Sequence, residues 1–247
     1  MTDDAPFFGI ENKDATGAVV LVCEHASNAF PAPWDDGLGL SEDQRRAHIA
    51  WDPGALGVAR GLAQALDGAL IHARASRLIY DLNRPPHAPG AMPTRSEIHD
   101  IPGNADLDAA ERLARTRAHY LPFHAALADL LACRLAQGLN PVLITVHSFT
   151  PIYFGQPRAV EFGLIHDADD RLARAICAQE TGLVTRLNEP YSAADGVAHM
   201  LARHATPLGL RHAMLEIRND LIATPEAQAA MAARLAPAIR AAINEVG

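Results

Sequence analysis

Four short clusters of polar residues carry side chains that hydrolytic chemistry needs. They are Glu24-His25, Asn83-Arg84, His147-Ser148 and Glu216. Each cluster follows or ends an apolar run of the length and composition that are typical of a buried strand. Because ligand sites in open α/β sheets lie beyond the carboxyl ends of strands, we expect these clusters to meet at one edge of a sheet.

His25 and His147 are the natural pair of metal ligands. Neutral imidazole is a common zinc donor, and catalytic zinc usually takes three protein ligands and a water molecule. The third ligand is open between two acids. Glu24 adjoins His25, and the two side chains can face one ion only if the strand has already ended. Asp52 precedes Pro53 and Gly54, so capping of the next helix is its competing role.

Arg84 and Glu216 have the chemistry to bind substrate and to move a proton. An arginine at position 84 can hold a carboxylate by two parallel hydrogen bonds, and Arg77 could assist. The alternative for Arg84 is a surface ion pair of little consequence. Glu216 could take a proton from water activated by the metal, or pair with Arg218 on the same strand face. Ser148 lacks the Gly-x-Ser-x-Gly elbow of a nucleophile.

The elements that would position these side chains alternate between strands and helices. We expect strands at 18–23, 69–73, 77–82, 141–147, 160–166, 183–187 and 212–217, and helices at 54–67, 107–137, 168–180, 197–205 and 225–244. Pro122 should kink the long helical region. The Pro- and Gly-rich segment 84–105 is expected to be a long functional loop. This order predicts one α/β domain over 1–247, with a mostly parallel or mixed sheet flanked by helices.

Composition narrows the class of protein. The 247 residues, 49% of them apolar, suffice for one sizeable core. The net charge of −8 gives no basic footprint for a nucleic acid, and no P-loop or Gly-x-Gly-x-x-Gly motif for a nucleotide occurs. The three cysteines lack the paired spacing of a disulfide framework. No signal peptide or membrane span is expected, so we predict a cytoplasmic protein, and its oligomeric state stays open.

Seven motifs, read together, resemble the N-formylglutamate amidohydrolase family. In order, they are VLVCEHASNAFP, HIAWDPGA, SRLIYDLNRP, IPGN, VHSFTP, NEPY and LEIRNDL, and they span roughly residues 18 to 222. That family is similar in fold to zinc carboxypeptidases and aspartoacylases. The resemblance implies His25 and His147 as ligands, Asn83 and Arg84 as the carboxylate site, and Glu216 as the general base.

The chain departs from those relatives at Asn28, which stands where they carry the glutamate of a His-x-x-Glu metal motif. Asp52 or Glu24 must then supply the third ligand. We favour Asp52, because it opens a helix close to the first strand and has the longer reach. Asn28 and Ser148 complete the set of residues that we expect to contact substrate.

The resemblance also implies a reaction. It predicts a zinc enzyme, or one that uses another divalent metal, which cleaves a small acidic N-acyl amino acid such as N-formylglutamate into formate and glutamate. The family name suggests a place in histidine degradation. Two alternatives stay open: a carboxypeptidase-like peptidase that acts on short peptides, and a non-catalytic binding protein that has lost its metal.

Overall fold

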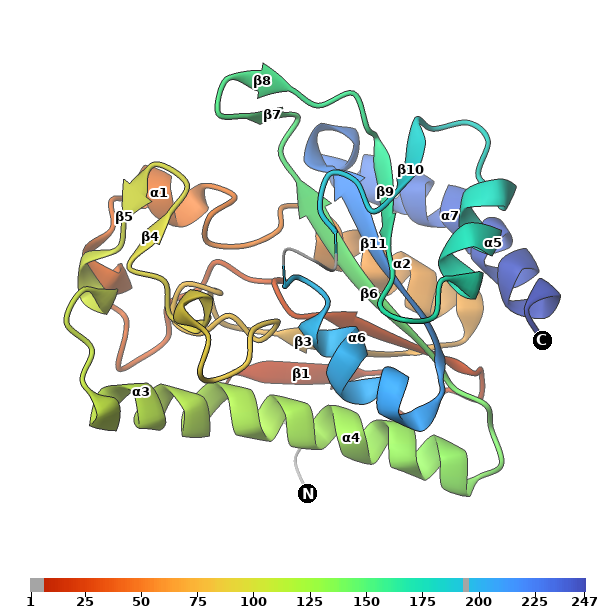
Figure 1. Cartoon of the computed structure of the whole chain (residues 1–247), viewed down its shortest axis with the longest axis horizontal. Helices are drawn as coiled ribbons and strands as arrows, with labels where there is room; N and C mark the ends of the chain where they lie inside the picture. The colour runs from red at the N-terminus through yellow and green to blue at the C-terminus, as the bar shows by residue number, and fades with distance from the viewer. Residues whose placement is uncertain (1–6, 193–195) are drawn as a thin grey trace.

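A seven-stranded mixed sheet forms the centre of the computed structural model, which describes residues 7–192 and 196–247 (Figure 1). The strand order is β1-β3-β2-β6-β11-β9-β10. Strands β3, β2, β6 and β11 run parallel, as do β9 and β10, whereas β1 and β9 run antiparallel to β3 and β11. The strands are β1 (Phe8–Glu11), β2 (Val19–Cys23), β3 (Ala69–Ala73), β6 (Val142–Phe149), β9 (Phe162–Ile165), β10 (Thr185–Leu187) and β11 (Arg211–Arg218). The expected mixed sheet is confirmed; β1 was not expected.

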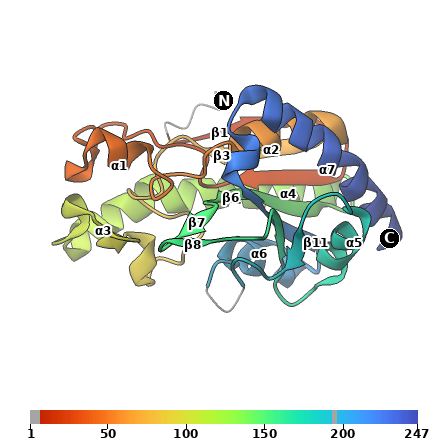
Figure 2. The same ribbon diagram turned by 90° about the horizontal axis from the view of Figure 1, so that it is seen from above.

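Helices cover both faces of the sheet (Figures 1 and 2). One face carries α2 (Ala55–Leu66), α5 (Arg171–Gln179) and α7 (Pro225–Glu245), and the other carries α4 (Leu121–Ala136) and α6 (His199–His204). Successive residues of β2 alternate between the two apolar layers, with Leu21 in the first and Val22 in the second. A strand that is buried on both faces has no polar side, which explains the unbroken apolar run at 18–23.

A third apolar cluster holds together the irregular segments beside the sheet. It includes Leu38, Ile49, Leu78, Ile79 and Ile101. The strand expected at 77–82 is wrong, because this segment forms successive turns. The N–H of Ile79 bonds the carbonyl of residue 76 at 3.1 Å, and that of residue 84 bonds the carbonyl of residue 81 at 3.0 Å. Burial of its apolar side chains, and not strand pairing, produces the strand-like pattern.

The remaining elements are short or extend the second helical layer. The region expected as one helix comprises α3 (Ala109–Arg115), the π-helix η4 (Thr116–Tyr120) and α4. Pro122 lies in the first turn of α4, directly after the π-helix, whose wider turn interrupts the regular hydrogen-bond ladder at this point. No helix of the described residues is both long and apolar enough to cross a membrane. The other short elements are η1 (Gly37–Gly39), α1 (Glu42–Arg46), η2 (Pro89–Ala91), β4 (Arg95–Ser96), β5 (His99–Asp100), η3 (Pro102–Asn104), β7 (Ile152–Tyr153), β8 (Gln156–Pro157), η6 (Thr206–Leu208) and η7 (Asn219–Ile222).

Candidate metal centre and active site

The neighbouring strands β2, β6 and β11 bring three of the predicted side chains together. His147 and Glu216 are directly paired in the β6–β11 ladder, so their side chains share one face of the sheet. His25 follows the end of β2, and its carbonyl accepts a hydrogen bond from the N–H of Asp52 at 2.9 Å. His25, Asp52, His147 and Glu216 therefore meet at the carboxyl edge of the parallel strands, where the sequence predicted a site.

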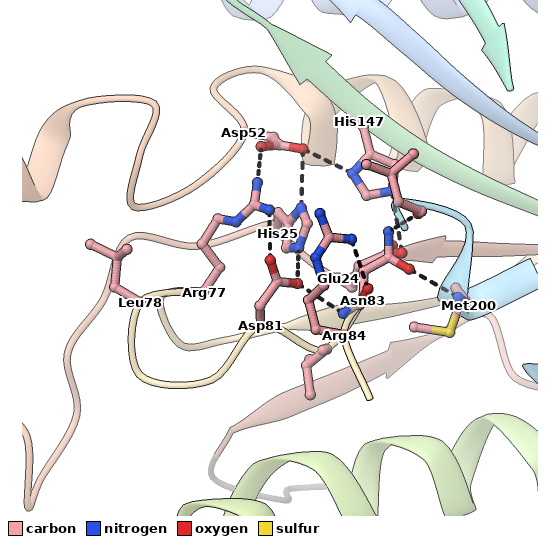
Figure 3. A network of polar contacts seen from close by, with 12 residues as sticks. Glu24, His25, Asp52, Arg77, Leu78, Asp81, Asn83, Arg84, His147 and Met200 are labelled. Carbon is pink, nitrogen blue, oxygen red and sulfur yellow. Dashed lines mark hydrogen bonds and ion pairs between the residues drawn. The ribbon is translucent and has the colours of Figure 1, made fainter. Parts of the chain in front are cut away.

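The side chains of His25, Asp52 and His147 form a buried cluster that could hold a metal ion (Figure 3). One ligand atom from each lies within 4.8 Å of the others. Oδ2 of Asp52 lies 2.9 Å from Nδ1 of His147 and 3.4 Å from Nδ1 of His25. Zinc bonds of about 2.0–2.1 Å in tetrahedral geometry separate neighbouring donor atoms by about 3.3 Å, so these spacings suit a small cation.

Asp52 does not cap the following helix, and the N-cap alternative is wrong. Helix α2 begins at Ala55 with Gly54 at its N-cap, and no side chain bonds its first turn. The Asp52 carboxylate contacts four side chains instead: those of His25, His48, Arg77 and His147.

The second nitrogen of each cluster histidine faces a carboxylate. Nε2 of His25 lies 2.7 Å from Oδ1 of Asp81, which can only accept, so Nε2 carries the proton. In the neutral ring, Nδ1 then keeps its lone pair on the side of Asp52. His147 repeats the arrangement, with Nε2 3.2 Å from Oε1 of Glu24. Carboxylates placed in this way behind metal-binding histidines orient the rings and raise their basicity.

Several buried polar atoms around this cluster make no hydrogen bond with the described residues. They are Nδ1 of His25, Nε2 of His147, both carboxylate oxygens of Glu24 and Oε2 of Glu216. A buried polar group that lacks a partner costs about 1–3 kcal/mol. Among them, the unpartnered Nδ1 of His25 lies on the side of Asp52, so this nitrogen fits a site that takes a divalent cation.

Burial and opposite charges set the protonation of the site. Burial raises the pKa of Glu216 to about 7, and the nearby charge of Asp52 adds to the increase. Burial would also raise the pKa of Asp52, but the charges and hydrogen bonds of His25 and His147 hold it well below its usual value. For His147, burial lowers the pKa most, but the charges and hydrogen bonds of Glu24 and Asp52 together raise it well above its usual value. Glu216 is therefore suited to exchange a proton near neutral pH.

A cavity of about 280 Å³ adjoins the cluster. Eight of the ten predicted site residues line it: His25, Asp52, Arg77, Asn83, Arg84, His147, Ser148 and Glu216. Glu24 lies behind the cavity wall. Asn28 lies elsewhere, and its amide donates to the Arg45 carbonyl at 3.0 Å. The 84–105 loop contributes Gly90, Pro93, Ser96 and Glu97 to the lining.

The residues predicted to bind a carboxylate differ in what they already contact. Arg77 lies between Asp52, at 3.4 Å, and Asp81, at 2.6 Å, so two carboxylates already balance its charge. The Asn83 amide donates to one backbone carbonyl and accepts from another residue's N–H. Arg84 donates to two backbone carbonyls, and no described carboxylate lies within ion-pair distance of it. Arg84 is thus the cavity arginine best placed to attract an anion.

Sequence reasoning gave no role to three polar residues that line the cavity close to the predicted site, His48, Asp81 and Tyr191. His48 lies 3.7 Å from Asp52 and four residues before it, and burial lowers its pKa to about 4. Asp81 follows Arg77 by the same interval. In a helix, a spacing of four residues would have indicated that His48 contacts Asp52 and that Arg77 contacts Asp81. Nothing in the sequence indicated such contacts in segments interpreted as a loop and a strand.

Fold and site together define an α/β protein with histidines and carboxylates clustered at the carboxyl edge of its central parallel strands. The profile of the N-formylglutamate amidohydrolase family matches residues 17–223. A gene product of Agrobacterium tumefaciens of known structure is 51% identical, with a TM-score of 0.95, over 97% of this chain and 96% of that one. An N-formylglutamate amidohydrolase from Ralstonia eutropha JMP134 has the same fold at 20% identity, with a TM-score of 0.68 and 98% of each chain covered. No curated protein matches the chain.

The chain therefore belongs to the N-formylglutamate amidohydrolase family, whose members hydrolyse amide bonds. The family resemblance noted from the seven motifs is confirmed, and so is the expectation of an enzyme.

Proposed function

We propose that this protein is a metal-dependent amidohydrolase of a small acidic N-acyl amino acid, with N-formylglutamate as the first candidate. The observation that carries the proposal is that the donor atoms of His25, Asp52 and His147 meet beside Glu216 in one cavity. Its volume of about 280 Å³ suits a single substituted amino acid. It lies at the small end of the usual range for ligand sites, about 300–1,000 Å³.

The metal would be held by Nδ1 of His25, the carboxylate of Asp52 and Nδ1 of His147. When bound, a divalent metal polarises a carbonyl group and lowers the pKa of water. Zinc is our first choice, although manganese, cobalt and iron accept the same donors. Asp81 and Glu24 would hold the two imidazoles in the required orientation, so Glu24, the alternative ligand, has a supporting role.

Glu216 is the proposed general base. Its carboxylate lies at the same level of the sheet as His147, and its free oxygen has no partner among the described residues. It takes the proton of the attacking water and passes it to the leaving nitrogen. A group with a pKa of about 7 can accept and return a proton at neutral pH.

Arg84 is the proposed anchor for a substrate carboxylate. Its guanidinium lines the cavity and has no described carboxylate partner. The loop over 84–105 narrows the same cavity, which favours a single amino acid over a longer peptide. The position of Asp52 beside both histidines favours an enzyme over the binding-protein alternative, because Asp52 would supply the acid that Asn28 does not.

The test is metal content paired with product analysis. We expect about one zinc ion per chain, and formate release from N-formylglutamate that a chelator stops and zinc restores. Asp52→Ala is the matched variant, and we expect it to purify without zinc. Chelator-resistant formate release would refute metal dependence. Release of amino acids from dipeptides, with no action on N-acyl amino acids, would favour the peptidase alternative.

A further inference from the structure

Tyr191 ends the Asn-Glu-Pro-Tyr motif and lines the cavity, although no role described above uses it. Strand β9 sets its position. The backbone carbonyl of Glu189 lies so close to Gly163 that an added Cβ would come within 2.0 Å of it. Gly163 is also the register partner of Glu216. Glu189 is therefore fixed next to the strand position of Glu216, the proposed general base. Tyr191 follows Glu189 by two residues, so this contact also limits where Tyr191 can lie.

The hydroxyl of Tyr191 differs from two other neutral donors of the cavity, those of Ser148 and Asn83. The Ser148 hydroxyl donates to the Pro53 carbonyl at 2.8 Å, and the Asn83 amide donates to a backbone carbonyl. Both donors are occupied by the protein itself. No described carbonyl or carboxylate accepts a hydrogen bond from Tyr191, so its proton remains available to a ligand in the cavity.

Arg158 holds the ring of Tyr191 from outside the cavity. Its guanidinium carbon lies 5.0 Å from the ring centroid of Tyr191 and 4.3 Å from that of Tyr153. A guanidinium has no acceptor atom, so Arg158 does not occupy the hydroxyl proton of Tyr191. Burial and the charge of Glu216 raise the pKa of Tyr191 to about 12, so the phenol stays protonated.

We propose that the Tyr191 hydroxyl donates a hydrogen bond to the carbonyl oxygen of the scissile amide, and that Arg158 is its positioning residue. This inference rests on the proposed function. As the water oxygen attacks the carbonyl carbon, the C=O π electrons move onto the carbonyl oxygen, and the phenol O–H stabilises that charge. This electron pair then re-forms the C=O bond, the C–N bond breaks, and the leaving nitrogen takes the proton held by Glu216. Tyr191 keeps its proton throughout.

Tyr191→Phe removes only the hydroxyl. We expect kcat to fall about 10²-fold, as for the loss of one oxyanion donor, with KM and zinc content little changed. Tyr80→Phe is the matched control, because it removes a buried tyrosine hydroxyl that does not line the cavity. We expect the control to keep its kcat within about threefold of the wild type, because its hydroxyl is not in the cavity and so does not contact substrate.

A second measurement separates stabilisation of charge from ordinary binding. A phosphonamidate analogue of N-formylglutamate places a tetrahedral anion where the carbonyl would be. The Tyr191→Phe substitution should raise the Kd of this analogue by about the same factor by which it lowers kcat. The Kd of glutamate should stay unchanged. Arg158→Gln should reproduce part of both losses. Arg158→Lys should recover some of them, because an ammonium group also interacts with a ring face.

The outcomes distinguish the two proposals. A wild type that neither hydrolyses N-acyl amino acids nor binds the analogue would refute the proposed function and this role together. An active wild type with an equally fast Tyr191→Phe variant would overturn the role of Tyr191 alone. So would a variant whose defect lies in KM, since that would show binding of the ground state.

Discussion

Asp81 bridges two functional side chains, and its charge is central to the proposed metal site. It accepts from Nε2 of His25 at 2.7 Å and pairs with Arg77 at 2.6 Å. We expect Asp81→Asn to weaken zinc binding about 10–100-fold, because an amide no longer fixes the tautomer or raises the basicity of His25. Competition with a chromogenic chelator measures this affinity. Asp100→Asn, on an exposed ion pair, is the control, and equal zinc affinity in both variants would contradict the role of Asp81.

Arg84 should select acidic substrates. Replacement by methionine removes the charge but retains much of the apolar stem. We expect KM for N-formylglutamate to rise about 10–100-fold, since a hydrogen bond to a charged group contributes about 1.5–3 kcal/mol. Steady-state kinetics with N-formylglutamate and N-formylnorvaline compare substrates that differ in one carboxylate. A similar rise in KM for both substrates would show that Arg84 supports the cavity wall and does not bind the side-chain carboxylate.

At the level of secondary structure, the contact between β9 and the segment before Tyr191 requires a glycine. A Cβ at position 163 would meet the Glu189 carbonyl at 2.0 Å. We expect Gly163→Ala to displace this segment, to lower the free energy of unfolding by about 1–3 kcal/mol, and to reduce kcat. Urea denaturation and kinetics on the zinc-loaded variant measure both effects. An unchanged kcat would show that the position of Tyr191 does not depend on this contact.

Helix α6 docks on α4 through a pair of neutral histidines. Nε2 of His124 lies 3.0 Å from the Leu82 carbonyl and must donate, so its Nδ1 accepts from Nε2 of His204 at 2.7 Å. Burial lowers the pKa of His124 to about 2 and that of His204 to about 4. A proton on Nδ1 of His124 would place two donors face to face.

This pairing predicts loss of stability in acid. Both folded-state pKa values lie below the unfolded value of about 6.5, so the unfolded chain binds more protons as the pH falls. The contribution of the pair is complete above pH 6.5 and is lost progressively below it, by up to about 1.4 kcal/mol per pH unit for each histidine. His204→Gln should flatten the fall in unfolding free energy between pH 6.5 and 4.5. Parallel curves for variant and wild type would contradict the assignment.

For the whole molecule, metal binding should couple three separate parts of the chain. His25, Asp52 and His147 come from the end of β2, the segment before α2, and β6. A metal that binds only the folded state stabilises it by about 2.7 kcal/mol at a concentration 100 times its Kd. We expect zinc to raise the midpoint of thermal unfolding and a chelator to reverse the shift. An equal shift in Asp52→Ala would place the metal elsewhere.

The sequence by itself determined the parallel centre of the fold and most of its site. Apolar runs such as 18–23 and 212–217 are strands because each is buried on both faces, and their ends carry His25 and Glu216. Parallel strands end at a common edge, so the polar residues that follow them were predictable as one site. The local pattern also predicted helices such as 225–244, where apolar residues recur with helical spacing.

Only the tertiary structure showed which residues the irregular segments contribute to the candidate site. The segment 77–82 resembles a strand because it is buried, but its turns place Asp81 behind His25. Asp52 was open between cap and ligand until its contacts with both histidines were known. Tyr191 ends a family motif, but nothing local placed it in the cavity, since its position depends on a backbone contact between Glu189 and Gly163, which are distant in sequence. Strand ends follow from local patterning, whereas buried turns and close backbone contacts depend on residues that only the folded chain brings together.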